Sequence, residues 1–539
     1  MPTFSLMRVF VLSIVCLLPL SAIGALAAEA PKHGGILTFV VASHPPSFDG
    51  HREYTFAMLQ PTRPFYSVLI RVNPENPSSP TDFVGDLALE VPEATDGDKK
   101  YTFKLRKNAR FWDRQPVTAH DVVASFNKII FPPPGIVSAR KAFYSMVDKV
   151  YAEDDYTVTF VLKFPSSAFI AALANPFNYI YSAKKLAQDM HWYEQNILGS
   201  GPFIFTQFQA GAFIEGERNP NYHHPGKPYL DGFRATFEKD QSKRVRAIRK
   251  GQAMIEFRGF PPRSRDLLVR ALAYQVTVQE SDWNSYLLVV PNHLVKPFDD
   301  PRVRRALTLA IDRWSGSERL SKIAIVKKVG GIVFPGHPLA ATKEELQKVA
   351  GYWPDLKKSR AEARRLLRAA GVPVGFTFKF HIRPVDQPYN IVGRWLIKQW
   401  RSIGLNAEAW VQPTKPFFKT LRSRGPNFEV SIDWHTGALV NPLLDISKFV
   451  SSDRSDFNFA NYKDRVLDDL FDKMNRTLDV VEQRRLMRRF EKRVLDEQAH
   501  MLVTQWWYRI IPHRSIVRGW KIGPSHYVPQ DLANIWLAE

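Results

Sequence analysis

The chain has 539 residues, of which 45% are hydrophobic, 13% aromatic and 24% charged. This composition is typical of a folded globular protein and excludes a disordered or low-complexity chain, and the length predicts more than one domain because one hydrophobic core rarely serves so many residues. The 74 Lys and Arg residues outnumber the 53 Asp and Glu residues, and the resulting net charge of +21 is compatible with anionic partners.

Residues 1–28 have the features of a secretory signal peptide. Arg8 supplies a short basic region, residues 9–20 are almost entirely apolar, and small residues precede Ala27 and Ala28. We therefore predict export to the periplasm with cleavage near Ala27 or Ala28, which leaves a mature chain of charge +20 once Arg8 is removed. A membrane helix is the less favoured alternative, because proline, serine and glycine interrupt the segment.

The single cysteine, Cys16, lies inside this predicted signal peptide. The mature chain is then expected to have no disulfide, no catalytic thiolate and no cysteine-ligated zinc, so its stability must come from large hydrophobic cores.

Strand and helix patterns alternate along the first part of the chain. Residues 36–41 predict a buried strand. Residues 101–106 alternate apolar and polar side chains, which is typical of a strand with one solvent-exposed face. Thr118 and Asp121 have the spacing of a capping box, and the helical pattern that follows should end before the three prolines that begin at Pro132.

The second half of the chain is richer in helices. Asp300 and Pro301 predict a helix start, Ser359 with Glu362 predicts another that Gly371 ends, and residues 466–474 and 487–494 have helical spacing. Because strands and helices alternate throughout, we predict an α/β fold with mixed sheets.

No motif in the sequence indicates catalysis. There is no complete P-loop, no G-x-S-x-G turn and no H-E-x-x-H helix. The one histidine doublet, His223-His224, lies in a sequence typical of an exposed turn, and we do not expect it to bind a metal. We therefore predict no catalytic residues, no metal and no cofactor, and favour binding over enzymatic turnover.

Three sequence blocks resemble a known family, the exported solute-binding proteins of ABC importers in the peptide/nickel class called family 5. The first block reads YTFKLRKNARFWD at 101–113 and PVTAHDVVASF at 116–126. The second reads GSGPF at 199–203, ERNPNY at 217–222 and PYLDG at 228–232. The third reads PFDDPRVRRAL at 297–307 and AIDR at 310–313. Their order along the chain makes the resemblance strong.

This resemblance implies the two-lobe periplasmic-binding-protein fold, type II, with a ligand cleft between the lobes. The first lobe is expected to contain residues 29–285, with an extra subdomain inserted at about 56–180. The second lobe is expected at 286–505, and residues 506–539 would return to the first lobe. Such a protein works by closing around its ligand, because a ligand that contacts both lobes stabilises the closed state.

The resemblance also points to a ligand-contacting strand and loop in the second lobe. Family members often have there a tryptophan, glycines, an acid and an Asn-Pro or Asp-Pro pair, and this chain reads DWHTGALVNP at 433–442. The residues implied at the ligand are Trp434, Gly437, Asn441 and Asp433. Trp434 could instead be an ordinary core residue.

The acid with which peptide-binding members hold a ligand's α-ammonium has no evident match, since Ala438 or a neighbour stands at its place. Strand alternation should place Asp433 on the opposite face from Trp434. Asp445 is the other candidate, although acids after a turn more often cap a helix. We therefore expect weak binding of peptides with a free α-amine and better binding of ligands that are neutral or anionic at that end, such as a blocked peptide, a glycoside or a phosphorylated sugar.

The function implied by the resemblance is capture of an oligopeptide or related small polar solute and its delivery to an ABC permease in the inner membrane. The expected partners are that ligand and that permease, with no nucleic acid, and the protein is expected to be a monomer. Two alternatives stay open: a secreted hydrolase with an unrecognised site, and a sensory relative that hands its ligand to a receptor.

Overall fold

The computed structural model describes residue 1 and residues 29–538 of the chain. The predicted signal peptide, including Cys16 and the cleavage site, therefore lies outside the described residues. Within residues 29–538, no helix is both long enough and apolar enough to cross a membrane.

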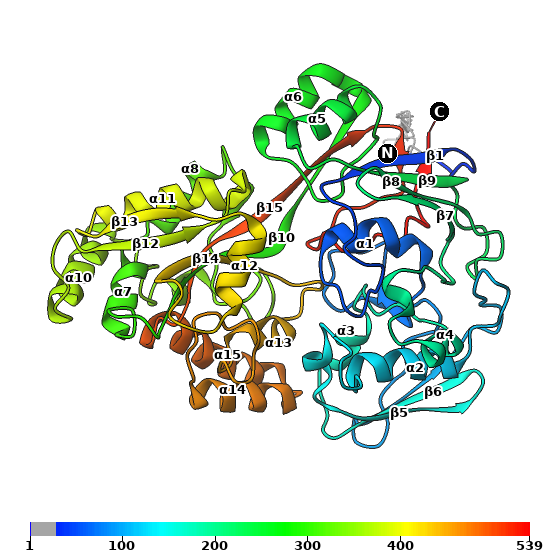
Figure 1. Ribbon diagram of the computed structural model, residues 1–539, viewed down its shortest axis with the longest axis horizontal. Helices are drawn as coiled ribbons and strands as arrows, with labels where there is room; N and C mark the ends of the chain where they lie inside the picture. Colours follow the sequence, from blue (N-terminus) through cyan, green and yellow to red (C-terminus); the bar gives the residue numbers. More distant parts are fainter. Residues whose placement is uncertain (2–28, 539) are drawn as a thin grey trace.

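Five sheets make up the β structure of the described residues (Figure 1). The largest has six strands in the order β11 (Val326–Lys328), β15 (Leu502–Arg514), β10 (Val276–Pro291), β14 (Val430–Thr436), β12 (Thr377–Ile382) and β13 (Asn406–Val411). A four-stranded sheet has the order β1 (Ile36–Val41), β9 (Gly232–Phe237), β8 (Phe213–Arg218) and β7 (Phe203–Gln209). A three-stranded sheet contains β4 (Lys100–Lys104), β6 (Thr157–Leu162) and β5 (Val147–Asp154). Two small pairs are β2 (Ile70–Val72) with β3 (Phe83–Gly85), and β16 (Val517–Arg518) with β17 (Trp536–Leu537).

The two larger sheets contain both parallel and antiparallel neighbours. β1 runs parallel to β9 while β9, β8 and β7 pair antiparallel, and β12 runs parallel to both β13 and β14 while β10 pairs antiparallel with β14 and β15. The predicted α/β class with mixed sheets is confirmed.

Helices surround these sheets. In chain order they are α1 (Phe56–Thr62), α2 (Ala119–Ile130), α3 (Phe169–Leu173), α4 (Ala183–Gln188), α5 (Gln241–Arg249), α6 (Pro262–Leu272), α7 (Pro301–Leu309), α8 (Arg313–Leu320), α9 (Lys343–Leu346), α10 (Leu356–Ala369), α11 (Ile391–Arg401), α12 (Thr414–Arg422), α13 (Pro442–Asp445), α14 (Arg465–Arg476) and α15 (Val480–Lys492).

Local capping signals begin and end several helices where the sequence predicts. The Asp121 carboxylate accepts a hydrogen bond from the backbone N–H of Thr118 at 2.8 Å, and α2 ends at Ile130, before the prolines. The Asp300 carboxylate likewise accepts from the backbone N–H of Arg302 at the start of α7. These ends depend on groups a few residues apart, so they can be predicted locally.

The predicted start of the helix at Ser359 is wrong. α10 begins at Leu356, and its N-cap is Asp355, whose side chain accepts from the backbone N–H of Lys358 at 3.0 Å. Ser359 instead is buried within the helix and donates to the carbonyl oxygen of Leu309 at 2.7 Å. Gly371, with a φ of +74°, follows the helix end as predicted.

Two long strands join the two halves of the molecule in Figure 1. β10 and β15 pair along most of their length, with register shifts near Asp282 and Tyr286, and they run from the six-stranded sheet towards the half that holds β1. The last residues of the chain lie against this second half, where a Cβ on Gly35 would be 2.9 Å from the Leu537 side chain. The lobe boundaries near 285 and 505 stay predictions.

Candidate ligand-binding site

Two of the segments that follow parallel strands meet at one edge of the six-stranded sheet. β12 ends at Ile382 and leads to Arg383, and β14 ends at Thr436 and leads to Gly437. Because β12 and β14 are parallel, their carboxyl ends lie at the same edge. In α/β proteins this edge is the usual position of a ligand site.

Trp434 and Asp433 lie on opposite faces of β14, as strand geometry predicts. Trp434 is paired in register with Leu287 of β10, and Asp433 with Leu288. Trp434 is partly buried against the rings of Tyr389 and Phe418, with centroid distances of 5.8 Å and 5.4 Å. Asp433 is 1% exposed and forms an ion pair with Lys448, with 2.7 Å between Nζ and Oδ2.

Gly437 and Asn441 shape the loop after β14. A Cβ on Gly437 would be 2.3 Å from Oδ1 of Asp445 and 2.4 Å from Nδ2 of Asn284, so this position has no room for a side chain. The Asn441 side chain accepts from the backbone N–H groups of Leu443 and Leu444 and is therefore the N-cap of α13.

The Asp445 side chain does not cap a helix: Asn441 caps α13, and at the start of the short 3-10 helix Ile446–Phe449 Asp445 makes no side-chain capping hydrogen bond. Asp445 is the last residue of α13, and its carboxylate lies 3.0 Å from Nε2 of His435 and 3.4 Å from Nδ2 of Asn284. Asp445 and Asp433 are thus both engaged by neighbouring side chains.

A line of aromatic rings leads from Trp434 to the strands that join the two halves. Tyr389 contacts both Trp434 and Trp507 of β15, each at 5.8 Å between centroids. Trp507 in turn packs edge to face on Trp283 of β10 at 5.1 Å. We call Phe418, Trp434, Tyr389, Trp507 and Trp283, together with Phe56 at the start of α1, the central aromatic cluster.

Two arginines lie over rings at opposite ends of the central aromatic cluster. The Cζ atom of Arg383 is 4.7 Å from the centroid of Tyr389 and 5.1 Å from that of Trp434. Arg258, in the loop between α5 and α6, has its Cζ 5.3 Å from Phe56 and 5.5 Å from Trp283. Guanidinium groups in such positions are attracted by the negative faces of the rings.

Tyr389 lies close enough to both arginines for their charges to affect its pKa. Burial raises the pKa of Tyr389 to about 12, while the positive charges of Arg383 and Arg258 act in the opposite direction. His526, beside Trp283, stays neutral because burial and the charges of Arg509 and Arg258 hold its pKa well below the ordinary value. Its Nδ1 accepts a hydrogen bond from Nε1 of Trp283 at 2.9 Å.

Sequence reasoning found only Trp434 of this cluster. Arg258 is flanked by Phe257 and Gly259 in EFRGF at 256–260, and Arg383 directly follows a strand. These were the only signals for the two arginines in the sequence. Neither signal predicts that the two arginines belong to one aromatic cluster, because they are 125 positions apart in the chain.

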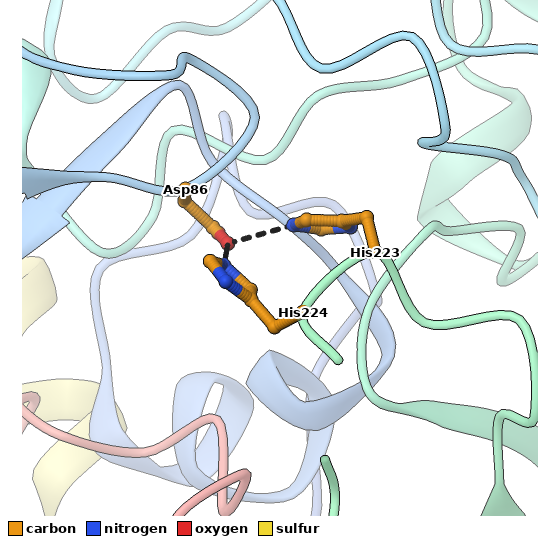
Figure 2. Close-up of side chains that lie close together, drawn as sticks. All are labelled: Asp86, His223 and His224. Carbon is orange, nitrogen blue, oxygen red and sulfur yellow. Dashed lines mark hydrogen bonds and ion pairs between the residues drawn. The ribbon is translucent and has the colours of Figure 1, made fainter. Parts of the chain in front are cut away.

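The histidine doublet is the one group of potential metal ligands among the described residues (Figure 2). The prediction of an exposed turn is wrong, since His223 is 1% exposed and His224 is only partly exposed. Nε2 of each lies 3.1 Å from Oδ1 of Asp86. These residues pack together because the turn folds back onto the segment after β3, which local sequence patterns could not show.

Asp86 already has cationic partners. Burial alone would raise its pKa, but Arg71 and the hydrogen bonds from both imidazoles hold that pKa well below the ordinary value. Nη2 of Arg63 lies 3.6 Å from the other carboxylate oxygen, which also accepts from the backbone N–H of Val68 at 2.9 Å. A divalent cation would be added next to two buried arginines, so the contacts fit an internal hydrogen-bond network better than a metal site.

Comparison with characterised proteins supports the resemblance found in the sequence. The chain is 26% identical over 464 residues to di/tripeptide-binding protein 1 of Pseudomonas aeruginosa (strain UCBPP-PA14), which covers 80% of this chain and 82% of that protein. It is also 26% identical over 415 residues to the glutathione-binding protein GsiB of Escherichia coli (strain K12), covering 74% and 76% of the two chains.

Solved structures share the fold. The periplasmic binding protein DppA of Helicobacter pylori, in complex with the peptide STSA, superposes with a TM-score of 0.79 at 22% identity over 94% of this chain and 99% of that one. The binding protein AgaA of A. tumefaciens R10, in complex with agropinic acid, has a TM-score of 0.80 at 21% identity with the same coverage. The fold is therefore that of periplasmic binding proteins of the peptide-binding type, as predicted.

The sequence profile of bacterial extracellular solute-binding proteins, family 5 middle region, matches residues 82–457. The match covers more than half of the chain and includes β12, β14 and most of the central aromatic cluster. Since members of this family bind solutes and are not enzymes, the hydrolase alternative is not favoured. The chain belongs to the family 5 extracellular solute-binding proteins.

Proposed function

We propose that the protein captures a small peptide or a related polar solute in the periplasm and delivers it to the permease of an ABC importer in the inner membrane. The observation that carries this proposal is the central aromatic cluster, which collects side chains from both sides of the β10–β15 strand pair. Phe56 and Arg258 precede β10, whereas Tyr389, Phe418 and Trp434 follow it.

A ligand held between these two groups would favour the closed state of the protein. Only the difference between its contacts in the closed and open states drives closure, so contributions from both halves are needed. Several contacts already link the halves. Nε2 of Gln483 donates to Oγ of Ser167 at 2.8 Å, the guanidinium of Arg476 lies over Phe164, and Arg422 donates to the hydroxyl of Tyr54.

Trp434 is the residue predicted from sequence that we propose as a ligand contact, because it is only partly buried and lies within the cluster. Gly437 and Asn441 would act by shaping the adjoining loop. The relatives described as di/tripeptide-binding and glutathione-binding support a peptide-like ligand. We further propose that the exported protein functions as a monomer, with the first lobe at 29–285 and 506–539 and the second at 286–505.

The experiment is a calorimetric comparison of alanyl-phenylalanine with N-acetyl-alanyl-phenylalanine, preceded by native mass spectrometry of the purified protein for co-purified solute. We expect one-to-one binding without turnover and a preference for the acetylated form. A clear preference for the free amine that is lost in Asp433→Asn or Asp445→Asn would restore the ordinary peptide-binding mode. Hydrolysis of the peptides would contradict the binding function itself.

A further inference from the structure

Arg258 is a partly buried cation without a carboxylate partner among residues 29–538. Its guanidinium contacts the rings of Phe56 and Trp283, and no acidic side chain in the described part of the chain pairs with it. Burying a charge in this way costs free energy unless an anion or several acceptors compensate.

Two buried acidic side chains, Glu256 and Asp433, interact with other cations. Glu256, two residues earlier in the same loop, accepts from Nε of Arg244 at 2.9 Å. Asp433, on the far face of β14, forms its ion pair with Lys448 at 2.7 Å. The negative charge of Glu256 acts on Arg258, but its carboxylate is hydrogen-bonded to Arg244 and forms no ion pair with Arg258.

Further positive charge surrounds the same rings. Burial lowers the pKa of Arg258, and the charges of Arg244 and Arg383 lower it further, although Tyr389 and Glu256 act in the opposite direction. Burial also lowers the pKa of Arg509 to about 9, with a further contribution from Arg258. Arg509 is 0% exposed and donates to three backbone carbonyls, those of Gly523, Ser525 and Phe257. Groups whose pKa values are shifted by burial and by like charges are concentrated at functional sites.

Apart from the Tyr389 hydroxyl, which can donate or accept, the polar groups of the cluster and of the two arginines are hydrogen-bond donors only. A guanidinium has only donors, and so has an indole. Nε1 of Trp507 is buried and has no hydrogen-bond partner among the described residues. A group that only accepts hydrogen bonds, such as a carboxylate or a phosphate, complements this set, whereas an ammonium group does not.

We propose that Arg258 and Arg383 form an anion-binding subsite that holds a carboxylate or phosphate group of the ligand beside the central aromatic cluster. This inference rests on the proposed solute-binding function and names the chemical class of the solute. Arg258 precedes β10 and Arg383 follows it, so an anion that contacts both guanidinium groups draws the two halves together and contributes directly to closure. The flat rings beside the subsite favour an apolar or planar group attached to the anion.

The test uses matched pairs of probes that differ only in charge. N-acetyl-alanyl-phenylalanine is compared with its C-terminal amide for the carboxylate, and glucose 6-phosphate with glucose for the phosphate. Binding is measured by calorimetry to the mature protein and to the variants Arg258→Gln, Arg258→Lys and Arg383→Gln. The exposed residue Arg489 of α15 provides the matched control Arg489→Gln. Thermal unfolding of each variant verifies that it is folded.

We expect the anionic member of at least one pair to bind about tenfold to a hundredfold more tightly than its neutral partner. Arg258→Gln and Arg383→Gln should each remove most of that preference, Arg258→Lys should keep part of it, and Arg489→Gln should leave it unchanged. If neutral and anionic members bind equally in the wild-type protein, the anion subsite is refuted while solute binding stands. If no probe binds and no solute co-purifies, the proposed function fails, and the subsite fails with it.

Discussion

Nζ of Lys448 lies 2.7 Å from Oδ2 of Asp433, and both side chains are almost fully buried between β14 and the segment that follows α13. Asp433, the residue next to Trp434, thus neutralises the buried Lys448. Its position explains why a carboxylate adjacent in sequence to a candidate ligand residue need not face the ligand.

Asp433→Asn should therefore reduce stability more than ligand binding. Removing one partner of a buried ion pair leaves an uncompensated charge and typically costs about 3–5 kcal/mol. We expect a loss of this size in denaturant unfolding, and a similar loss for Lys448→Met. The double variant Asp433→Leu with Lys448→Met should recover much of it, because neither charge remains. Full stability of Asp433→Asn would show that the ion pair is not formed in solution.

Gly437→Ala should destabilise the loop after β14. The added Cβ would meet Oδ1 of Asp445 and Nδ2 of Asn284 at 2.3 Å and 2.4 Å, so the cluster must move apart, at a typical cost of about 1–3 kcal/mol. Gly425→Ala is the control, because the atom nearest its Cβ belongs to the exposed side chain of Asn427. Thermal unfolding of both variants measures the difference, and equal midpoints would contradict the close packing at Gly437.

Ligand should compact the protein, and cross-linking the two halves should slow ligand exchange. The hydrogen bond between Gln483 and Ser167 marks a place where the halves touch. Since the only cysteine lies in the predicted signal peptide, Ser167→Cys with Gln483→Cys introduces a unique pair for a short thiol-specific cross-linker.

We expect the cross-linked protein to release bound ligand at least tenfold more slowly than the same variant without cross-linker, as followed by fluorescence. Small-angle scattering of the protein without cross-linker should show a smaller radius of gyration when a ligand is added. Identical scattering profiles and identical exchange rates would contradict closure.

Stability should fall as the pH drops from about 6.5 towards 4. Burial lowers the pKa of His51 to about 3 and those of His381 and His500 to about 4, from an ordinary value of 6.5. Above pH 6.5 these groups are neutral in both the folded and unfolded states, so their full contribution is present there. Below pH 6.5 the unfolded chain binds protons that the folded protein does not, and the free energy of unfolding decreases by about 1.4 kcal/mol per pH unit for each group.

Urea unfolding between pH 7.5 and 4.5 measures this slope. His381→Phe keeps a ring beside Trp410, on which His381 stacks at 4.4 Å, and removes one titrating group. The slope of this variant should be shallower by about 1.4 kcal/mol per pH unit. A slope equal to that of the wild-type protein would show that His381 is protonated in the folded state.

The amino-acid sequence by itself determined the features that depend on near neighbours. The capping box at Thr118 and Asp121, the Asp300-Pro301 helix start and the alternation around Trp434 all arise from groups within a few residues of one another. Ordered motifs also identified the family, since the third block from Pro297 lies inside the region that the family profile matches. Even at this level one signal failed, because Asp355 competes with Ser359 for the N-cap of α10.

Only the tertiary structure decided which charged side chains form ion pairs with one another. Arg258 lies over Phe56 and Trp283, whereas Arg383 lies over Tyr389 and Trp434 in the same aromatic cluster. Asp86 contacts two histidines from a turn more than 130 residues away. A buried charge is stable only with the partner that the fold brings to it, and that partner can come from anywhere in the chain. Sequence patterns report periodicity and local hydrogen bonds, so they could propose an α/β solute-binding fold but could not show that Asp433 is paired and Arg258 is not.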